Sequence, residues 1–263
     1  MTYLEAFIIA VIEGLTEFLP ISSTGHMILA SSLMNIQNPK FAETFEIVIQ
    51  LGAILAILFI YIKRFFVGIN IYLKLFVAFI PTGIVGLLAY KTIKLYLFNP
   101  YTVSISLIIG GVALLLLDKW SAQKESKYKE IEDISFIDAI KIGLIQCVSM
   151  IPGVSRSAAT IFGGISSGFN RQQAAEFSFL LAIPTMFAAS GYDLLKEKDN
   201  IHSADALILL FGALIAFIVA FFAVKGFVAF LNKYGFKHFG YYRIILGVLF
   251  LIYAINTGLK LTV

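Results

Sequence analysis

Charged residues are scarce in this chain of 263 residues. Asp, Glu, Lys and Arg together make up 14% of it, whereas hydrophobic residues make up 59% and the mean hydropathy is +0.90. Ordinary soluble domains carry a charge at about a quarter of their positions. The composition therefore excludes such a domain and indicates an all-α polytopic membrane protein, with the bilayer as a partner. The net charge of +4 does not indicate a nucleic-acid partner, because membrane proteins collect Lys and Arg at one face.

Cysteine is nearly absent as well, and basic residues are absent from the N-terminal segment of the chain. Cys147 is the single cysteine, so no disulfide can form within the chain. No Lys or Arg precedes Lys40, whereas a secretory signal peptide begins with a basic segment. We therefore expect the first apolar stretch to belong to the fold rather than to a cleaved leader.

Long apolar runs are plentiful, and six of them suit a membrane crossing. A transmembrane helix needs roughly 20 mostly apolar residues. These runs are continuous, which disfavours a barrel of short alternating strands. The six predicted transmembrane helices cover about residues 41–62, 71–90, 101–117, 172–192, 205–224 and 241–259.

Two further apolar segments are interrupted. Residues 3–34 are broken at Pro20 and the polar run that follows it, and residues 136–168 are broken at Pro152-Gly153. Irregular backbone at membrane depth persists only where protein or a watery cavity satisfies it. We therefore predict two re-entrant helical hairpins, each made of two half-helices and a turn.

The two halves of the chain correspond. A hairpin and three spans (3–117) precede a mixed-charge linker (118–135), and a second hairpin and three spans (136–259) follow it. Three crossings per half reverse the direction of the second copy, which gives an inverted-topology repeat within one membrane domain (1–263). Such repeats usually bind their ligand near the midplane, where broken helices meet. Three pairs of like residues stand 132 or 133 positions apart: Pro20 and Pro152, Ser23 and Ser155, and Glu43 and Glu176.

The basic residues other than Arg156 are divided unevenly between the two predicted sides. Thirteen of them, Arg243 included, fall on the side of the linker, and six fall on the other side. Because cytoplasmic loops carry the excess of Lys and Arg, the linker is predicted to be cytoplasmic. Both termini and the ends of the first hairpin then face the outer side of the membrane, where we expect the site to open.

Residues 13–28 of the first hairpin contain two carboxylates, at a depth where ionisable groups are costly. Glu13 and Glu17 are four residues apart and share one face of a helix. Such a pair suits a divalent cation, Mg²⁺ or Ca²⁺, because both prefer oxygen ligands. Alternatively, one carboxylate acts as a general acid or base, or the pair lies at a helix end in contact with water. We predict both as metal ligands and Glu17 also as a catalytic residue.

Three hydroxyl groups follow the first proline break. Ser22, Ser23 and Thr24 precede the second half-helix, whose N-terminus offers free N–H groups to an anion, and Gly25 permits a tight turn. Simple N-capping by a hydroxyl is the structural alternative. His26 can serve as general base, general acid or nucleophile toward phosphorus. We predict Ser22, Thr24 and Gly25 as substrate-binding residues, and Ser23 and His26 as catalytic ones.

The second hairpin contributes an arginine between two serines, Ser155-Arg156-Ser157. A guanidinium can hold phosphate oxygens in a fork and neutralise the charge that builds up in phosphoryl transfer. An ion pair of this arginine with Glu13 or Glu17 is a structural alternative that remains compatible with catalysis. We predict Arg156 as catalytic, and Ser155 and Ser157 as substrate-binding.

Carboxylates, hydroxyls, a histidine and an arginine at membrane depth together describe a metal-assisted site for an anionic phosphate ester carried on a lipid. The segments EGLTEFLPISSTGHMIL (13–29) and IPGVSRSAATI (151–161), extended by AAEFSFLLAIPT (174–185), resemble the bacterial undecaprenyl-pyrophosphate phosphatase family, which is associated with bacitracin resistance. The resemblance covers the whole chain. It implies a multi-pass protein of the bacterial cytoplasmic membrane that hydrolyses undecaprenyl pyrophosphate to undecaprenyl phosphate, recycling the lipid carrier for peptidoglycan synthesis.

By this resemblance, Glu13 and Glu17 match the acidic pair of the family, Ser23 and His26 its SSTGH element, and Arg156 the arginine of its PGxSR element. The mechanism we expect has Ser23, deprotonated by His26 or Glu17, attacking a phosphate that Arg156 holds. Attack by His26 itself, or by water, would use the same residues. Arg156 is then expected about one phosphate away from the Ser23 hydroxyl.

Two questions stay open at this level. Inverted repeats with broken helices also occur in transporters, so a lipid-carrier flippase or transporter is the alternative function. The oligomeric state is not determined by the sequence, and a homodimer is compatible with it.

Overall fold

The computed structural model of the chain describes residues 1–34, 36, 39–66, 68–123, 125–197 and 205–258. Throughout this part of the chain the regular structure is helical, and it contains no strand. The all-α class predicted from the composition is therefore confirmed. Residue 124 of the predicted linker, and residues 198–204 and 259 of the predicted second repeat, lie outside the described residues.

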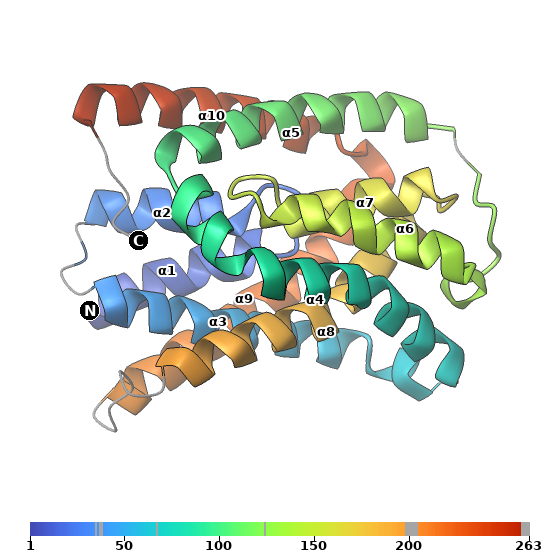
Figure 1. The fold of residues 1–263 in the computed structure, drawn as a ribbon, viewed down its shortest axis with the longest axis horizontal. Coiled ribbons are helices and arrows are strands. Elements are labelled where there is room, and N and C mark those ends of the chain that lie inside the picture. The colour runs from blue at the N-terminus through green and yellow to red at the C-terminus, as the bar shows by residue number, and fades with distance from the viewer. Residues whose placement is uncertain (35, 37–38, 67, 124, 198–204, 259–263) are drawn as a thin grey trace.

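Six long helices form the bulk of the molecule (Figure 1). Within the described residues, each of the six contains a stretch long and apolar enough to cross a membrane, so the six predicted spans are confirmed. The last helix but one runs past its predicted end and stops at Gly235, whose φ of +68° lies in the left-handed region where helices commonly end. The long helices are α3 (Pro39–Ile60), α4 (Ile69–Leu97), α5 (Pro100–Ser121), α8 (Arg171–Glu197), α9 (Ala206–Tyr234) and α10 (Lys237–Thr257).

Two pairs of short helices occupy the segments predicted as hairpins. The first pair is α1 (Tyr3–Thr16) and α2 (Ser23–Met34), and the second is α6 (Phe136–Gln146) and α7 (Arg156–Ser166). The pairs enter from opposite ends of the molecule and their turns meet near its middle (Figure 1). The non-helical backbone is thus enclosed by protein, as a membrane interior requires. Short 3-10 helices complete the described regular structure: η1 (Ile62–Phe66), η2 (Ile131–Asp133) and η3 (Cys147–Met150).

We call residues 17–22 the first turn and residues 147–155 the second turn. Each ends in a serine with a positive φ, +70° at Ser22 and +76° at Ser155, a conformation that is uncommon for a residue with a side chain. Each serine Oγ accepts a hydrogen bond from the N–H three residues on, at Gly25 (3.4 Å) and Ala158 (3.2 Å). The hydroxyls therefore cap the helices that follow the turns.

The two positive-φ serines establish how the halves of the chain correspond. Ser22 and Ser155 lie 133 positions apart, and so do the first residues of α1 and α6. The second turn holds one more residue than the first between its proline and its serine, so Ser23 corresponds in position to Arg156. The predicted match of Ser23 with Ser155 is therefore off by one residue.

The helices of the two halves pack reciprocally. α1 packs against α9 and α6 packs against α4, while α5 and α10 lie side by side. Glycines make the first two contacts close, because an added Cβ would lie 2.8 Å from the Ala216 carbonyl oxygen at Gly14. At Gly143 it would lie 2.0 Å from the carbonyl oxygen of Ala78. Small residues at helix contacts are the usual means of tight packing in lipid.

A buried arginine of α10 binds both turns. Arg243 is fully buried, and its guanidinium donates hydrogen bonds to the carbonyls of Pro20 (3.0 Å) and Gly153 (2.8 Å). It also donates to the α5 carbonyls of Ser106 (3.2 Å) and Leu107 (3.4 Å). The sequence count that placed Arg243 with the cytoplasmic basic residues is therefore wrong. One side chain instead holds the first turn, the second turn and α5 together.

We expect Arg243→Lys to destabilise the protein by about 3 kcal/mol, because an ammonium group cannot reproduce the planar fork that serves four buried carbonyls. Thermal unfolding of the detergent-solubilised protein measures this loss. Lys237→Arg, at the exposed start of α10, is the control and should leave the unfolding temperature unchanged. Equal stability of the two variants would contradict the role given to Arg243.

We expect Gly143→Ala to lower the free energy of unfolding by about 2 kcal/mol, because its Cβ would collide with the backbone of α4. Gly86→Ala is the matched control within α4. There the new Cβ would meet only the end of the Met150 side chain, at 3.5 Å. The same unfolding measurement should show Gly86→Ala to be neutral or slightly stabilising, since alanine favours a helix. Similar losses in both variants would argue against a tight contact between α6 and α4.

Candidate active site

The two turns bring a carboxylate, a hydroxyl and a guanidinium together. The Ser23 hydroxyl donates to Glu17 Oε2 at 2.5 Å, and Arg156 Nη2 donates to Glu17 Oε1 at 3.1 Å. Glu17 is buried, with 7% of its surface exposed. Its carboxylate therefore lies between the serine of the first half and the arginine of the second, which are residues of corresponding position. The ion pair with Glu17 that the sequence left open for Arg156 is present.

Arg156 is held on several sides and keeps one donor free. Nη1 donates to the Ser178 carbonyl at 3.0 Å, and Nη2 also approaches Met186 Sδ at 3.4 Å. The guanidinium lies 5.5 Å from the ring centroid of Phe18, a buried residue of the first turn. Nε is buried and has no hydrogen-bond partner. A buried donor without a partner is costly, and an oxyanion would satisfy it.

Glu13 supplies a second buried carboxylate. Only 3% of its surface is exposed, and its Oε1 has no hydrogen-bond partner. It interacts electrostatically with Glu17, Glu46 and Arg156. Facing carboxylates in a buried site require a proton or a cation between them.

The residues present suit a hard divalent cation in the kind of atom they offer. Both carboxylates carry the oxygen ligands that Mg²⁺ and Ca²⁺ prefer, and one of those oxygens lacks a partner. Within the described part of the chain, no group of three or more His, Cys, Asp and Glu side chains is placed to hold a metal ion. A cation here would therefore take two protein ligands, Glu13 and Glu17, and complete its shell with water or substrate oxygens.

The ring nitrogens of His26 are bound to Ser22 and Tyr242 rather than to a carboxylate. Nδ1 lies 2.8 Å from the Ser22 carbonyl oxygen, and Nε2 lies 2.7 Å from the Tyr242 hydroxyl of α10. The Ser23 hydroxyl is bound to Glu17 instead. Of the two bases considered for Ser23, Glu17 is therefore the one hydrogen-bonded to the hydroxyl, whereas both His26 nitrogens are bound elsewhere.

The residues predicted to bind substrate differ in what their side chains contact. Ser157 is fully buried and donates to the Phe18 carbonyl at 2.8 Å, which joins α7 to the first turn. Gly25 faces α5, where a Cβ would lie 3.4 Å from Val103. Thr24 is exposed. Ser22 and Ser155, as described above, cap the helices α2 and α7. Ser157 thus joins α7 to the first turn, and Gly25 lets α2 approach α5.

Two residues of the site region escaped the sequence analysis, and they are neighbours on α10. Arg243 lies inside the predicted span 241–259, and an ionisable residue inside such a span is itself a sign of function. Because Arg243 lies near the start of that span, the count of basic residues assigned it to the adjoining loop instead. Tyr242 gave no signal, because tyrosine is common in membrane helices and its contact with His26 spans 216 positions.

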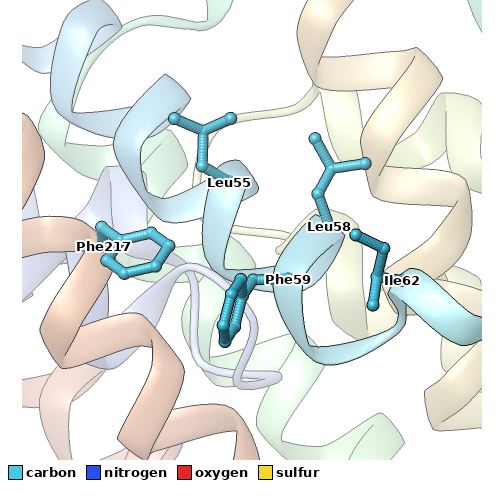
Figure 2. A pocket seen from close by; sticks show the side chains of 5 residues that line it. All are labelled: Leu55, Leu58, Phe59, Ile62 and Phe217. Atoms are coloured by element: carbon cyan, nitrogen blue, oxygen red, sulfur yellow. The ribbon is translucent and has the colours of Figure 1, made fainter.

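An apolar recess of about 480 Å³ lies elsewhere, on the outer surface of the bundle. Figure 2 shows side chains from α3, from α9 and from the start of η1 around it. None of the predicted site residues lines this recess, so the polar site between the turns is separate from it. Its lining residues are Leu55, Leu58, Phe59, Ile62 and Phe217.

Comparison with known proteins agrees with the resemblance noted from the sequence. The family model of bacitracin resistance protein BacA matches residues 6–249. The undecaprenyl-diphosphatase of Wolinella succinogenes is 51% identical over 96% of this chain and 98% of its own. Those of Bdellovibrio bacteriovorus and Campylobacter fetus are 49% and 48% identical, over 96% and 97% of this chain and 96% and 100% of their own. The chain therefore belongs to the bacitracin resistance protein BacA family, a family of multi-pass bacterial membrane proteins to which the six spans conform.

Proposed function

We propose that this chain is an undecaprenyl-diphosphatase, which hydrolyses undecaprenyl diphosphate to undecaprenyl phosphate and inorganic phosphate and so recycles the lipid carrier of cell-wall synthesis. Relatives of that name match it along nearly their whole length. The observation that carries the proposal is the Glu17 carboxylate held between the Ser23 hydroxyl and the Arg156 guanidinium. A phosphate needs the same two partners, a nucleophile on one side and a cation on the other.

The membrane arrangement is part of the proposal. Repeats 3–117 and 136–259 form an inverted pair around a cytoplasmic linker, 118–135, and each begins with a re-entrant hairpin. The reciprocal packing of α1 on α9 and of α6 on α4 supports this arrangement, as does the entry of the hairpins from opposite ends (Figure 1). The site then opens to the outer side of the cytoplasmic membrane, with the prenyl chain in the bilayer.

The first chemical step uses residues that already touch. The Ser23 oxygen forms a bond to the terminal phosphorus while the bond from that phosphorus to the bridging oxygen breaks, and undecaprenyl phosphate leaves. The Ser23 proton moves to Glu17 Oε2, the atom to which it is hydrogen-bonded at 2.5 Å. Arg156 turns its free Nε, together with Nη2, toward the phosphate oxygens and stabilises the charge that develops on them.

The second step releases inorganic phosphate. Water forms a bond to the phosphorus of phosphoserine 23 and gives its proton to His26 Nε2, while the bond to the serine oxygen breaks. That oxygen recovers its proton from Glu17, and His26 then returns its proton to solvent. His26 follows Ser23 by three residues on α2, so both side chains project from the same face of the helix.

A divalent cation on Glu13 and Glu17 is the cofactor we propose. When bound, it would neutralise charge on the diphosphate and relieve the repulsion between the two carboxylates. The support for it is the buried Glu13 oxygen that lacks a partner.

Ser23→Ala should reduce phosphate release from undecaprenyl diphosphate by at least about 1,000-fold, because the nucleophile is lost. Ser22→Ala removes a neighbouring hydroxyl that caps α2, and it should keep most of the activity. Acid quenching with substrate labelled in its terminal phosphate, followed by peptide mapping, should locate phosphoserine at position 23. Full activity of Ser23→Ala, with His26→Ala inactive, would overturn Ser23 as the nucleophile and leave attack by His26 or by water.

The same assay distinguishes the enzyme from a transporter. Detergent-purified protein experiences no membrane gradient, so a phosphatase releases phosphate there and a pure flippase does not. Absence of phosphate release by the wild-type protein would therefore overturn the proposed function.

Chelation by EDTA should lower the rate on the order of 100-fold, and added Mg²⁺ or Ca²⁺ should restore it. Glu13→Gln should raise the cation concentration needed for half-maximal activity, since one of two anionic ligands is lost. Glu5→Gln, on the same helix but outside the site, is the control and should need no additional cation. Activity that chelation leaves unchanged would remove the cation from the mechanism.

A further inference from the structure

The hydrogen bonds of His26 determine which tautomer its neutral imidazole ring adopts. Nδ1 lies 2.8 Å from the Ser22 carbonyl oxygen, which can only accept. Nδ1 therefore carries the proton of the neutral ring, and Nε2 is left as an acceptor. The Tyr242 hydroxyl, 2.7 Å from Nε2, then donates to it. This assignment follows from the partners of the two nitrogens.

Tyr242 also fixes the orientation of the ring. The planes of His26 and Tyr242 are within 6° of parallel, and their centroids are 5.6 Å apart. Parallel planes suit a hydroxyl that approaches the lone pair of Nε2 in the plane of the imidazole ring. The tyrosine is 44% exposed, so it covers the histidine from the rim of the bundle. The hydrogen bonds at the two ring nitrogens together leave His26 one position and one tautomer.

The contact belongs to the same framework that holds the first turn. Tyr242 precedes Arg243, which binds the carbonyl of Pro20 in that turn. The carbonyl that holds His26 Nδ1 is that of Ser22, the last residue of the same turn. Two consecutive residues of α10 therefore set the position of the first turn and of His26 relative to each other.

We propose that Tyr242 is a positioning residue of the phosphatase reaction, an inference that rests on the function proposed above. Its hydroxyl holds His26 with Nε2 unprotonated until the hydrolytic water arrives. The water then replaces the hydroxyl as donor to Nε2 and passes its proton there as it attacks phosphoserine 23. Tyr242 itself makes no contact with the substrate.

A double-mutant cycle tests the coupling. Purified Tyr242→Phe, which keeps the ring but loses the hydroxyl, should lower kcat about 10-fold and leave KM within about twofold. In the His26→Ala background, Tyr242→Phe should cause no further loss, because the group that it positions is gone. Tyr241→Phe, the neighbouring and more exposed tyrosine (57%), is the matched control and should behave as wild type in both backgrounds.

A spectroscopic measurement tests the contact without relying on activity. The chain has three histidines, so ¹⁵N-histidine labelling yields few ring signals, and the His26→Ala variant identifies those of His26. We expect the wild-type signals to report the Nδ1–H tautomer. Tyr242→Phe should move the Nε2 signal of His26 and leave those of His202 and His238 in place.

Two results would overturn the inference. One is an equal loss of kcat from Tyr242→Phe with and without His26, or no loss at all. The other is an Nε2 signal of His26 that Tyr242→Phe does not move. If the wild-type protein hydrolyses no undecaprenyl diphosphate, the proposed function fails, whereas the spectra still decide whether Tyr242 sets the tautomer of His26.

Discussion

Two turns of irregular backbone lie at the centre of this molecule, and carbonyl groups of both are bound by the buried guanidinium of Arg243. Membrane-embedded backbone cannot use water to satisfy its polar groups, so interrupted helices survive only where protein replaces water. A planar group with five donors can serve several carbonyls at once, and it also bonds α5. Glu17, Ser23 and Arg156, the residues to which we assign the chemistry, lie on these turns or directly after them. Their spacing therefore depends on one side chain that performs no chemistry.

Opposite charges stabilise the buried carboxylates and the guanidinium of the site before substrate binds. Glu17 is bound by a cation and a hydroxyl, and the adjacent Glu13 adds a second buried negative charge. Burial makes unpaired charges expensive, so the carboxylates and Arg156 stabilise one another. A diphosphate that brings further negative charge requires additional positive charge, which a divalent cation would supply. The ion pair thus stabilises the turns and belongs to the site that we propose.

The two halves share a backbone design but differ in chemistry. Each turn ends in a serine of positive φ that caps a helix, and the next position is Ser23 in one half and Arg156 in the other. At the position equivalent to Glu13, the second half has Gln146, which is fully buried and donates to Thr82 at 2.7 Å. Its carbonyl oxygen, like one oxygen of Glu13, lacks a hydrogen-bond partner. An amide in place of a carboxylate leaves the second half without the anionic ligands, so the halves provide complementary parts of one site.

The sequence by itself determined the helical class, the six spans, the two interrupted segments and the family, because hydropathy and the polar motifs are local properties of the chain. It also indicated Glu13, Glu17, Ser23 and Arg156 as candidate site residues, because polar and ionisable groups are costly to place in apolar membrane segments. Only the tertiary structure decided that Ser23 binds Glu17 rather than His26. It also showed that Ser157 joins α7 to the first turn. The match of Ser155 with Ser22, rather than with Ser23, came from the structure as well. The structure alone identified Tyr242 and Arg243, which act across more than 200 positions on His26 and Pro20. Contacts of that length arise from the packing of α10 against the turns, and no local pattern of residues encodes them.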